Sequence, residues 1–232
     1  MTPAERLAAL GASPWFSHLP TELADWIAGT ARVVTLAAGE RLFSCGDAPS
    51  GVYYVVDGAI RIATSTADGK EALLTFIEQP QWFGEAPLFD DSPRPRDAWA
   101  ESDCRLLHLP QSLLVDFLEH HPRHWKSFGL LLAQKLRLAL HVIEANALLP
   151  PSQRLAQRLV AMAYGYGDWQ GAHRRVLDVQ QVDLGAMLTV SRQSVNQLLK
   201  DFESQGFLRT GRGSIEILDM PRFKLLALEG QA

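Results

Sequence analysis

Short apolar runs alternate with glycine or Asx turns between residues 33 and 109. Such runs, spaced by about ten residues, are typical of short β-strands in a roll or jelly roll. The dipeptides Asp57-Gly58 and Asp68-Gly69 tolerate the positive φ angles of tight turns, and they separate neighbouring runs. The predicted strands are residues 33–36, 52–56, 60–64, 73–77 and 105–109.

Helical periodicity replaces the strand pattern after Pro122, where a heptad stripe of apolar residues runs through an uninterrupted stretch of helix formers. The Pro150-Pro151 pair ends this long helix, because proline lacks an amide hydrogen and restricts the residue before it. Shorter helices are predicted at 20–28, capped by Thr21, and at 152–163, followed by a loop at 164–168. The heptad stripe consists of Trp125, Gly129, Leu132, Leu136, Ala139, Ile143 and Asn146.

The long helix carries a second apolar stripe that would face the β-roll. A helix with two apolar faces has two surfaces to cover. We therefore expect the heptad stripe to pair with its own copy in a homodimer, with Asn146 as the polar residue that fixes the register. The alternative is a helix that is buried inside one large monomer. The second stripe consists of Phe128, Leu131, Leu138 and Val142.

The segment from 181 to 217 predicts a helix-turn-helix followed by a hairpin. The first helix spans 181–188, the turn holds Thr189-Val190, and Ser191 caps a second helix that ends at about residue 204. Gly185 leaves room for a close crossing of the two helices. The apolar residues of the second helix share one face, and they are Val195, Leu198, Leu199 and Phe202.

The opposite face of the second helix carries residue types that match DNA. Arginine pairs with guanine, glutamine or asparagine with adenine, and lysine with phosphate. The hairpin of 207–210 and 214–217 places Arg212 at its tip, where a wing would touch the DNA backbone. The other interpretations are a solvated polar face and a module that docks a protein partner. The predicted DNA-binding residues are Ser191, Arg192, Gln193, Asn196, Gln197, Lys200 and Arg212.

Charge and composition narrow the class of protein. Residues 1–149 carry 12 basic and 18 acidic side chains, whereas residues 150–232 carry 10 basic and 8 acidic ones, so only the second part tolerates a polyanion easily. Two cysteines are too few for a disulfide scaffold or an iron–sulfur cluster. No export signal or membrane-spanning run is seen, so we expect a cytoplasmic protein. The G-x-S-x-G, Walker and H-E-x-x-H motifs are absent, so we expect no enzyme.

Histidines and cysteines are the remaining candidates for chemistry. Pro122 disfavours a regular helix through His120, His121 and His124, and no cysteine or suitably spaced carboxylate completes a tetrahedral set. We therefore interpret these histidines as an exposed junction before the long helix and expect no metal site. Cys45 and Cys104 are expected to pack as ordinary side chains, because the sequence around them does not indicate a lowered thiol pKa.

Three stretches of the chain resemble the Crp/Fnr superfamily of bacterial transcription regulators. The stretch LAAGERLFSCGDAPSGVYYVVDGAIRIATSTADGKEALLTF is similar to the family's cyclic-nucleotide-type β-roll. The stretch WFGEAPLFDDSPRPRDAWA is similar to its phosphate-binding cassette, and VSRQSVNQLLKDFESQGFLRT is similar to its recognition helix and wing. The resemblance spans nearly the whole chain. It implies an α+β fold with a jelly-roll-like β-roll sensor domain (1–121), a dimerisation helix (122–149) and a winged helix-turn-helix DNA-binding domain (150–232).

The resemblance also implies partners and site residues. Its partners are double-stranded DNA with a pseudo-palindromic site, a second copy of the chain, and RNA polymerase. Arg192, Gln193 and either Asn196 or Gln197 fall where the family reads bases, and Thr189 stands where the family usually has glycine. A small effector in the roll would modulate DNA binding through the dimer helices.

The cassette carries both matches and mismatches to a cyclic-nucleotide site. A cyclic phosphate needs backbone amides and an arginine, and the ribose needs an acidic residue. Pro95 lacks an amide hydrogen and Asp97 would place a carboxylate beside the phosphate, so cAMP is not favoured as the effector. Two alternatives stay open: another small effector such as cyclic di-GMP, and a filled roll in which the arginines pair with Asp90, Asp91 or Asp97. No resident cofactor is expected. The candidate effector-binding residues are Gly84, Glu85, Arg94, Arg96 and Asp97.

Overall fold

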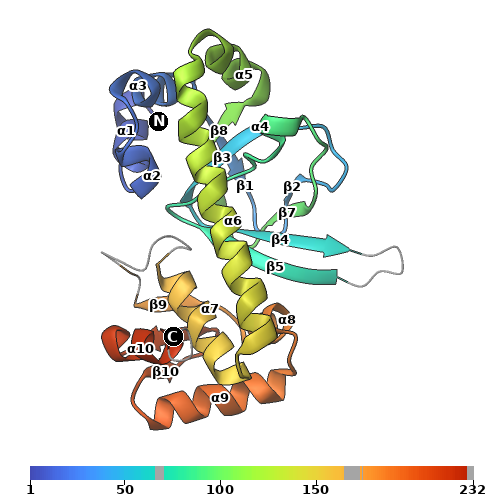
Figure 1. The fold of residues 1–232 in the computed structure, drawn as a ribbon, viewed down its shortest axis with the longest axis vertical. Helices are drawn as coiled ribbons and strands as arrows, with labels where there is room; N and C mark the ends of the chain where they lie inside the picture. Colours follow the sequence, from blue (N-terminus) through green and yellow to red (C-terminus); the bar gives the residue numbers. More distant parts are fainter. Residues whose placement is uncertain (66–70, 165–172, 174, 229–232) are drawn as a thin grey trace. The chain divides into compact units, whose positions relative to one another are not determined.

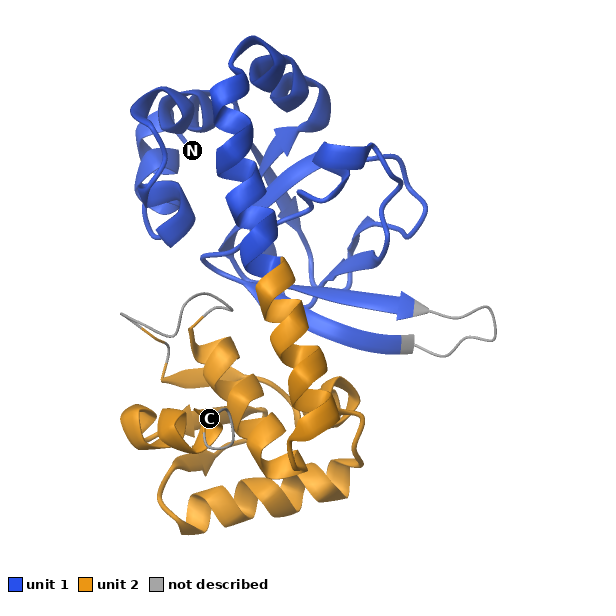
Figure 2. Cartoon of the chain, in the orientation of Figure 1, with its two compact units in different colours: residues 1–135 blue, residues 136–232 orange. Residues whose placement is uncertain are grey.

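The computed structural model describes residues 1–65, 71–164, 173 and 175–228. The chain divides into two compact units, residues 1–135 and residues 136–232 (Figure 2). The long helix α6 (Trp125–Leu148) crosses this division (Figure 1). The predicted turn at 68–70 and the loop residues 165–168 lie outside the described residues.

Two antiparallel four-stranded sheets form the first unit, in the orders β1-β8-β3-β6 and β2-β7-β4-β5. All five strands predicted from the sequence are confirmed, and three shorter ones were not predicted because runs of two to four residues carry too little periodicity. The strands are β1 (Arg32–Leu36), β2 (Arg41–Phe43), β3 (Gly51–Asp57), β4 (Ala59–Ser65), β5 (Glu71–Glu78), β6 (Trp82–Phe83), β7 (Asp97–Ala100) and β8 (Cys104–Pro110).

Strand β3 is buried on both faces, which explains its unbroken apolar sequence. Side chains alternate across a strand, so Tyr53 and Val55 point into the cluster between the two sheets. Val52 and Tyr54 instead join a second cluster, which the helices of this unit cover and which includes Phe128 of α6. Burial raises the pKa of Tyr54 to about 12. The sheet that holds β3 is therefore sandwiched between the roll's other sheet and the helices.

The helices of the first unit precede and follow the roll. The helix predicted at 20–28 is confirmed, but the predicted cap at Thr21 is wrong. Pro20 occupies the N-cap position with an extended backbone, so Thr21 is already helical and makes no capping bond. The shorter helices are α1 (Pro3–Leu10), α2 (Pro14–Ser17), α3 (Thr21–Thr30), α4 (Pro87–Asp90), α5 (Gln111–His120) and the 3₁₀ turn η1 (Pro122–His124).

The second unit is a winged helix-turn-helix. Its helices pack around a three-stranded sheet of order β10-β11-β9, and Leu184, Val195 and Phe202 are buried in its core. The predicted helix-turn-helix and hairpin are both confirmed, which completes the expected α+β architecture. Its elements are α7 (Pro151–Ala163), β9 (Val176–Asp178), α8 (Gln181–Leu188), α9 (Arg192–Ser204), β10 (Leu208–Thr210), β11 (Ser214–Ile217) and α10 (Met220–Leu228).

The turn between α8 and α9 depends on two residues. Thr189 ends α8 in the left-handed conformation, with φ of 56° and ψ of 42°. That conformation costs a residue with a Cβ about 1–2 kcal/mol, yet it reverses the chain as the family's usual glycine would. A Cβ added to Gly185 would lie 2.9 Å from the carbonyl oxygen of Val190, so the close approach of this turn to α8 requires glycine.

Candidate nucleic-acid interface and effector cassette

Helix α9 presents a polar face to solvent. Ser191 is its N-cap, and its Oγ accepts a hydrogen bond from the amide of Ser194 at 3.0 Å. Val195 and Leu199 are buried on the inner face, so the polar residues on the opposite side of the helix turn outward. Of the residues that α9 was predicted to offer to DNA, four are exposed and Asn196 is half-buried; the exposed ones are Arg192, Gln193, Gln197 and Lys200.

Three of the predicted reading residues lie together. Arg192, Gln193 and Asn196 line an open depression of about 550 Å³ on the surface. Residues three and four apart share one face of a helix, which explains the grouping. Gln197 is also exposed, and its Nε2 donates to Oδ1 of Asp201 at 2.9 Å. Of Asn196 and Gln197, it is Asn196 that lines the depression with Arg192 and Gln193.

The wing adds a cation to the same unit. Arg212 is exposed at the tip of the β10–β11 hairpin, which the amide of Gly211 closes by donating to the carbonyl of Ser214 at 2.8 Å. At the base of the hairpin, Glu216 lies 3.4 Å from both Arg175 and Arg209.

The three cations among the predicted DNA-binding residues are not neutralised in this way. Arg192, Lys200 and Arg212 form no ion pair with any other residue in the described ranges. Phosphate oxygens are the acceptors that such exposed cations bind in DNA complexes.

Arg94 of the cassette is buried, with 2% of its surface exposed. Its Nη1 donates to the carbonyl of Gly84 at 2.9 Å, and its Nη2 donates to the carbonyl of Gly51 at 2.6 Å and to Oγ of Ser50 at 2.9 Å. The guanidinium lies 4.4 Å from the ring centroid of Phe43. Burial lowers the pKa of Arg94, because it disfavours the charged guanidinium. The hydrogen-bond partners of this guanidinium are neutral groups rather than carboxylates.

The acidic residues of the cassette are also engaged. Glu85 is buried, and its Oε2 accepts a hydrogen bond from Nζ of Lys135 on α6 at 2.7 Å. Lys135 also donates to the carbonyl of Trp82 at 2.6 Å. Oδ1 of Asp97 accepts from the amide of Cys45 at 2.9 Å. The groups that would hold a ribose and a phosphate thus serve the protein's own backbone and side chains.

The cassette therefore does not fit a cyclic nucleotide in this arrangement. Arg94 is turned inward, the Glu85 carboxylate is paired, and Pro95 offers no amide hydrogen. Arg96 is exposed and donates to the carbonyl of Pro95 at 2.6 Å. The internal use of Arg94 agrees with a filled roll, but its partners are carbonyls and a hydroxyl rather than the aspartates suggested by the sequence.

The half-buried His108 and the buried Cys104 also pack in the roll. Nε2 of His108 lies 2.8 Å from the carbonyl oxygen of Ser50, and burial lowers the pKa of this imidazole. Sγ of Cys104 donates to the carbonyl of Ala59 at 3.1 Å, and burial raises the pKa of this thiol. Cys45, expected to pack, is instead exposed, since the loop after β2 carries it to the surface.

Helix α6 buries part of its second apolar stripe in the first unit and exposes part of the heptad stripe, while Leu138 and Val142 of the second stripe are half-buried. Phe128 and Leu131 are buried in the helix-covered cluster of the first unit. On the heptad stripe, Leu136 and Ile143 are 59% and 63% exposed. Trp125, the first residue of that stripe, packs against its own unit's core instead. The exposed positions further along the stripe are Ala139 and Asn146, while Gly129 and Leu132 are half-buried.

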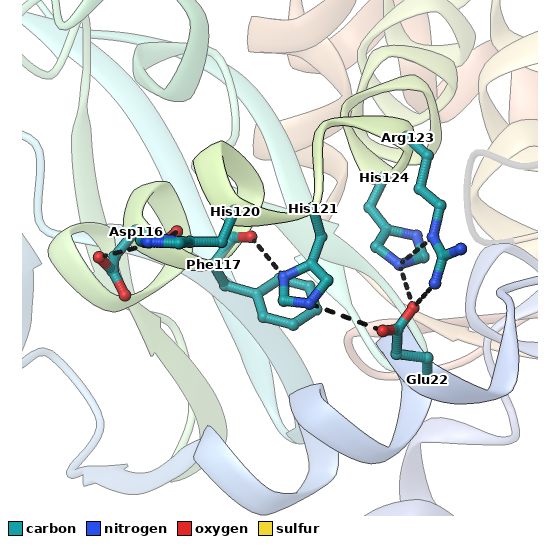
Figure 3. A network of polar contacts seen from close by, with 7 residues as sticks. All are labelled: Glu22, Asp116, Phe117, His120, His121, Arg123 and His124. Atoms are coloured by element: carbon teal, nitrogen blue, oxygen red, sulfur yellow. Dashed lines mark hydrogen bonds and ion pairs between the residues drawn. The ribbon is translucent and has the colours of Figure 1, made fainter.

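The interpretation of the three histidines as an exposed junction is wrong for His124, which is 1% exposed. Its Nε2 lies 2.9 Å from Oε2 of Glu22 on α3, and Arg123 contacts the same carboxylate (Figure 3). His121 lies 3.6 Å from the other oxygen of Glu22. The bonds from His124 and then from Arg123 lower the pKa of Glu22. This network fastens the start of α6 to α3 within the first unit.

No cluster of ligand side chains suited to a metal ion occurs within the described ranges. Among the helices that the structure describes, none is both long and apolar enough to cross a membrane. Sequence reasoning missed Lys135, Ser50 and Gln181 as partners of site residues. A partner that lies far away in the chain leaves no local pattern.

Two family models match the chain. The cyclic nucleotide-binding domain matches residues 33–121, and the Crp-like helix-turn-helix domain matches residues 153–226. Together with the geometry, they define a Crp-like transcription regulator with a helix-turn-helix DNA-binding domain and a cyclic-nucleotide-type β-roll. The matches cover most of the chain, and the chain belongs to the Crp/Fnr superfamily, as the resemblance implied.

Curated relatives and solved structures agree. The CRP-like cAMP-activated global transcriptional regulator of Mycobacterium tuberculosis is 27% identical over 190 residues, covering 82% of this chain and 85% of the relative. The cAMP-activated global transcriptional regulator CRP of Pasteurella multocida is 25% identical, with 78% and 87% covered. A CRP/FNR-family transcriptional regulator from Thermus thermophilus gives a TM-score of 0.63 at 26% identity, over 84% of this chain and 98% of that one. FixK2 from Bradyrhizobium japonicum shares the fold, with a TM-score of 0.72 at 21% identity, over 84% of this chain and 96% of that one.

Proposed function

We propose that the chain is a homodimeric regulator that reads a pseudo-palindromic DNA site with helix α9. The observation that carries the proposal is the grouping of Arg192, Gln193 and Asn196 on one outward face of a winged helix-turn-helix. The named relatives are transcription regulators rather than enzymes, which supports a binding function. The protein would act in the bacterial cytoplasm, where it would meet DNA and RNA polymerase.

The exposed half of α6 supports the dimer. Leu136 and Ile143 expose most of their apolar surface on the heptad stripe, and a second copy would remove that surface from water. A dimer would also present two α9 helices to two half-sites, so the symmetry of the DNA site follows from that of the protein.

The first test of the DNA-reading function concerns Arg192, at the start of α9. Replacing Arg192 by alanine is expected to weaken binding to the preferred site by about 1–3 kcal/mol and to relax the preference at one base pair in each half-site. The measurement is affinity at fixed salt for a pool of two-fold-symmetric sequences, selected and sequenced with the wild type and the variant.

Two variants serve as controls for this test. Lys200→Ala should weaken all sequences alike and lower the salt dependence of binding, because a phosphate contact carries no base information. Arg105→Ala, at an exposed position on β8, should change nothing. Wild-type binding without sequence preference at any salt concentration would refute the reading function and leave protein docking as the better explanation.

We further propose that the roll senses a small effector other than cAMP. The inward Arg94 and the paired Glu85 argue against cAMP, since a cAMP site needs both groups turned toward the ligand. The signal would shift the packing of the paired α6 helices, and the junction at Pro150 would reorient the DNA-binding units.

A thermal-shift series tests the effector. Saturating cAMP is expected to leave the melting temperature of the full chain unchanged, because only a ligand that binds the folded state raises it. The same series with cGMP, cyclic di-GMP and haem screens the alternatives. A dose-dependent rise with cAMP would contradict the proposal.

A further inference from the structure

The amide of Asn196 has a partner outside its own helix. Its Nδ2 donates to Oε1 of Gln181 at 3.0 Å. Gln181 is the first residue of α8, and Asn196 lies in the second turn of α9, so the bond joins the two helices of the helix-turn-helix. Both side chains are half-buried, whereas Arg192 and Gln193 beside them are exposed.

The direction of this bond matters for reading a base. An asparagine that binds adenine uses its carbonyl oxygen as acceptor and one amide hydrogen as donor. The Gln181 bond uses only one of the two Nδ2 hydrogens of Asn196, so Oδ1 and the second hydrogen remain for the base. An unheld amide would rotate broadly about its last torsion and would offer donor and acceptor in either order.

We propose that Gln181 is a positioning residue that fixes the amide of Asn196 in the orientation that reads one base pair. Gln181 sharpens specificity without contacting the base. This role rests on the proposed DNA-reading function and adds to it a residue outside the recognition helix.

The experiment compares relative affinities of the full-length protein for a site in which the Asn196-dependent base pair is changed to each of the four possibilities. That position is identified with Asn196→Ala. Gln181→Ala is expected to lower discrimination at that position about two- to tenfold, the range set by ordering one side chain. In the Asn196→Ala background the same change should have no further effect.

A conservative variant separates positioning from a merely structural role. Gln181→Glu can still accept from Nδ2 of Asn196, so it should keep the base preference while its added negative charge weakens all sequences alike. Gln180→Ala is the matched control, because Gln180 is the adjacent N-cap, exposed and without a side-chain capping bond. It should leave both affinity and preference unchanged.

Four results would overturn the assignment. An intact preference in Gln181→Ala would remove the positioning role alone, as would an equal weakening of all sequences. A loss of preference in Gln181→Glu as large as in Gln181→Ala would show that the glutamine serves the fold. If the wild type itself has no base preference, the proposed function falls together with this assignment.

Discussion

Replacing Arg94 by leucine is expected to destabilise the first unit by about 3–5 kcal/mol, because it leaves buried acceptors without donors. The carbonyls of Gly51 and Gly84 would lose the bonds that Arg94 donates, and the hydroxyl of Ser50 would keep only its bond with Tyr53. A domain is stable by only about 5–15 kcal/mol in total, so the loss would bring the roll close to unfolding at ordinary temperature.

Urea unfolding followed by tryptophan fluorescence measures this effect, since five of the six tryptophans lie in residues 1–135. Arg96→Leu is the matched control: Arg96 is exposed, so its loss should change stability by less than about 0.5 kcal/mol. An Arg94→Leu protein as stable as the Arg96→Leu protein would show that Arg94 does not hold the roll together. Its inward orientation would then have no structural purpose.

The cassette shows how far sequence reasoning reaches. Pro95 and Asp97 already disfavoured a cyclic phosphate, because a missing amide hydrogen and an extra carboxylate are properties of the residues themselves. The actual partners of Arg94 could not be predicted. They are mainly the backbone carbonyls of Gly51, which lies 43 residues away in the chain, and of Gly84, which lies 10 residues away. A backbone carbonyl is present in every residue, so it has no sequence signature.

The bounds of the helix-turn-helix were predicted almost to the residue, because the signals that define it are local in the sequence. The cap at Ser191 and the apolar spacing of Val195, Leu199 and Phe202 are local signals, and the packing of α8 on α9 needs only residues close in sequence. His124 shows the limit. Its partner Glu22 lies 102 residues earlier, so a side chain interpreted as exposed turns out to be buried.

Replacing both Leu136 and Ile143 by aspartate is expected to separate the proposed dimer into monomers. Each protomer would contribute two such side chains to the seam, and burying each is worth about 1.5 kcal/mol or more. Four lost contacts, with like charges in their place, should raise the dissociation constant of the dimer at least about 10³-fold. Sedimentation equilibrium at micromolar protein measures this directly.

The same variant separates the two levels of DNA recognition. A monomer keeps its α9 surface, so affinity for an isolated half-site should be unchanged, whereas affinity for the full site should fall about 100-fold or more because the second α9 helix is no longer tethered. Leu225→Asp is the matched control: Leu225 lies on α10, is 66% exposed, and is outside the seam. A Leu136→Asp, Ile143→Asp protein that remained dimeric would contradict the heptad seam. A wild type that was monomeric at the same concentration would contradict the dimer itself.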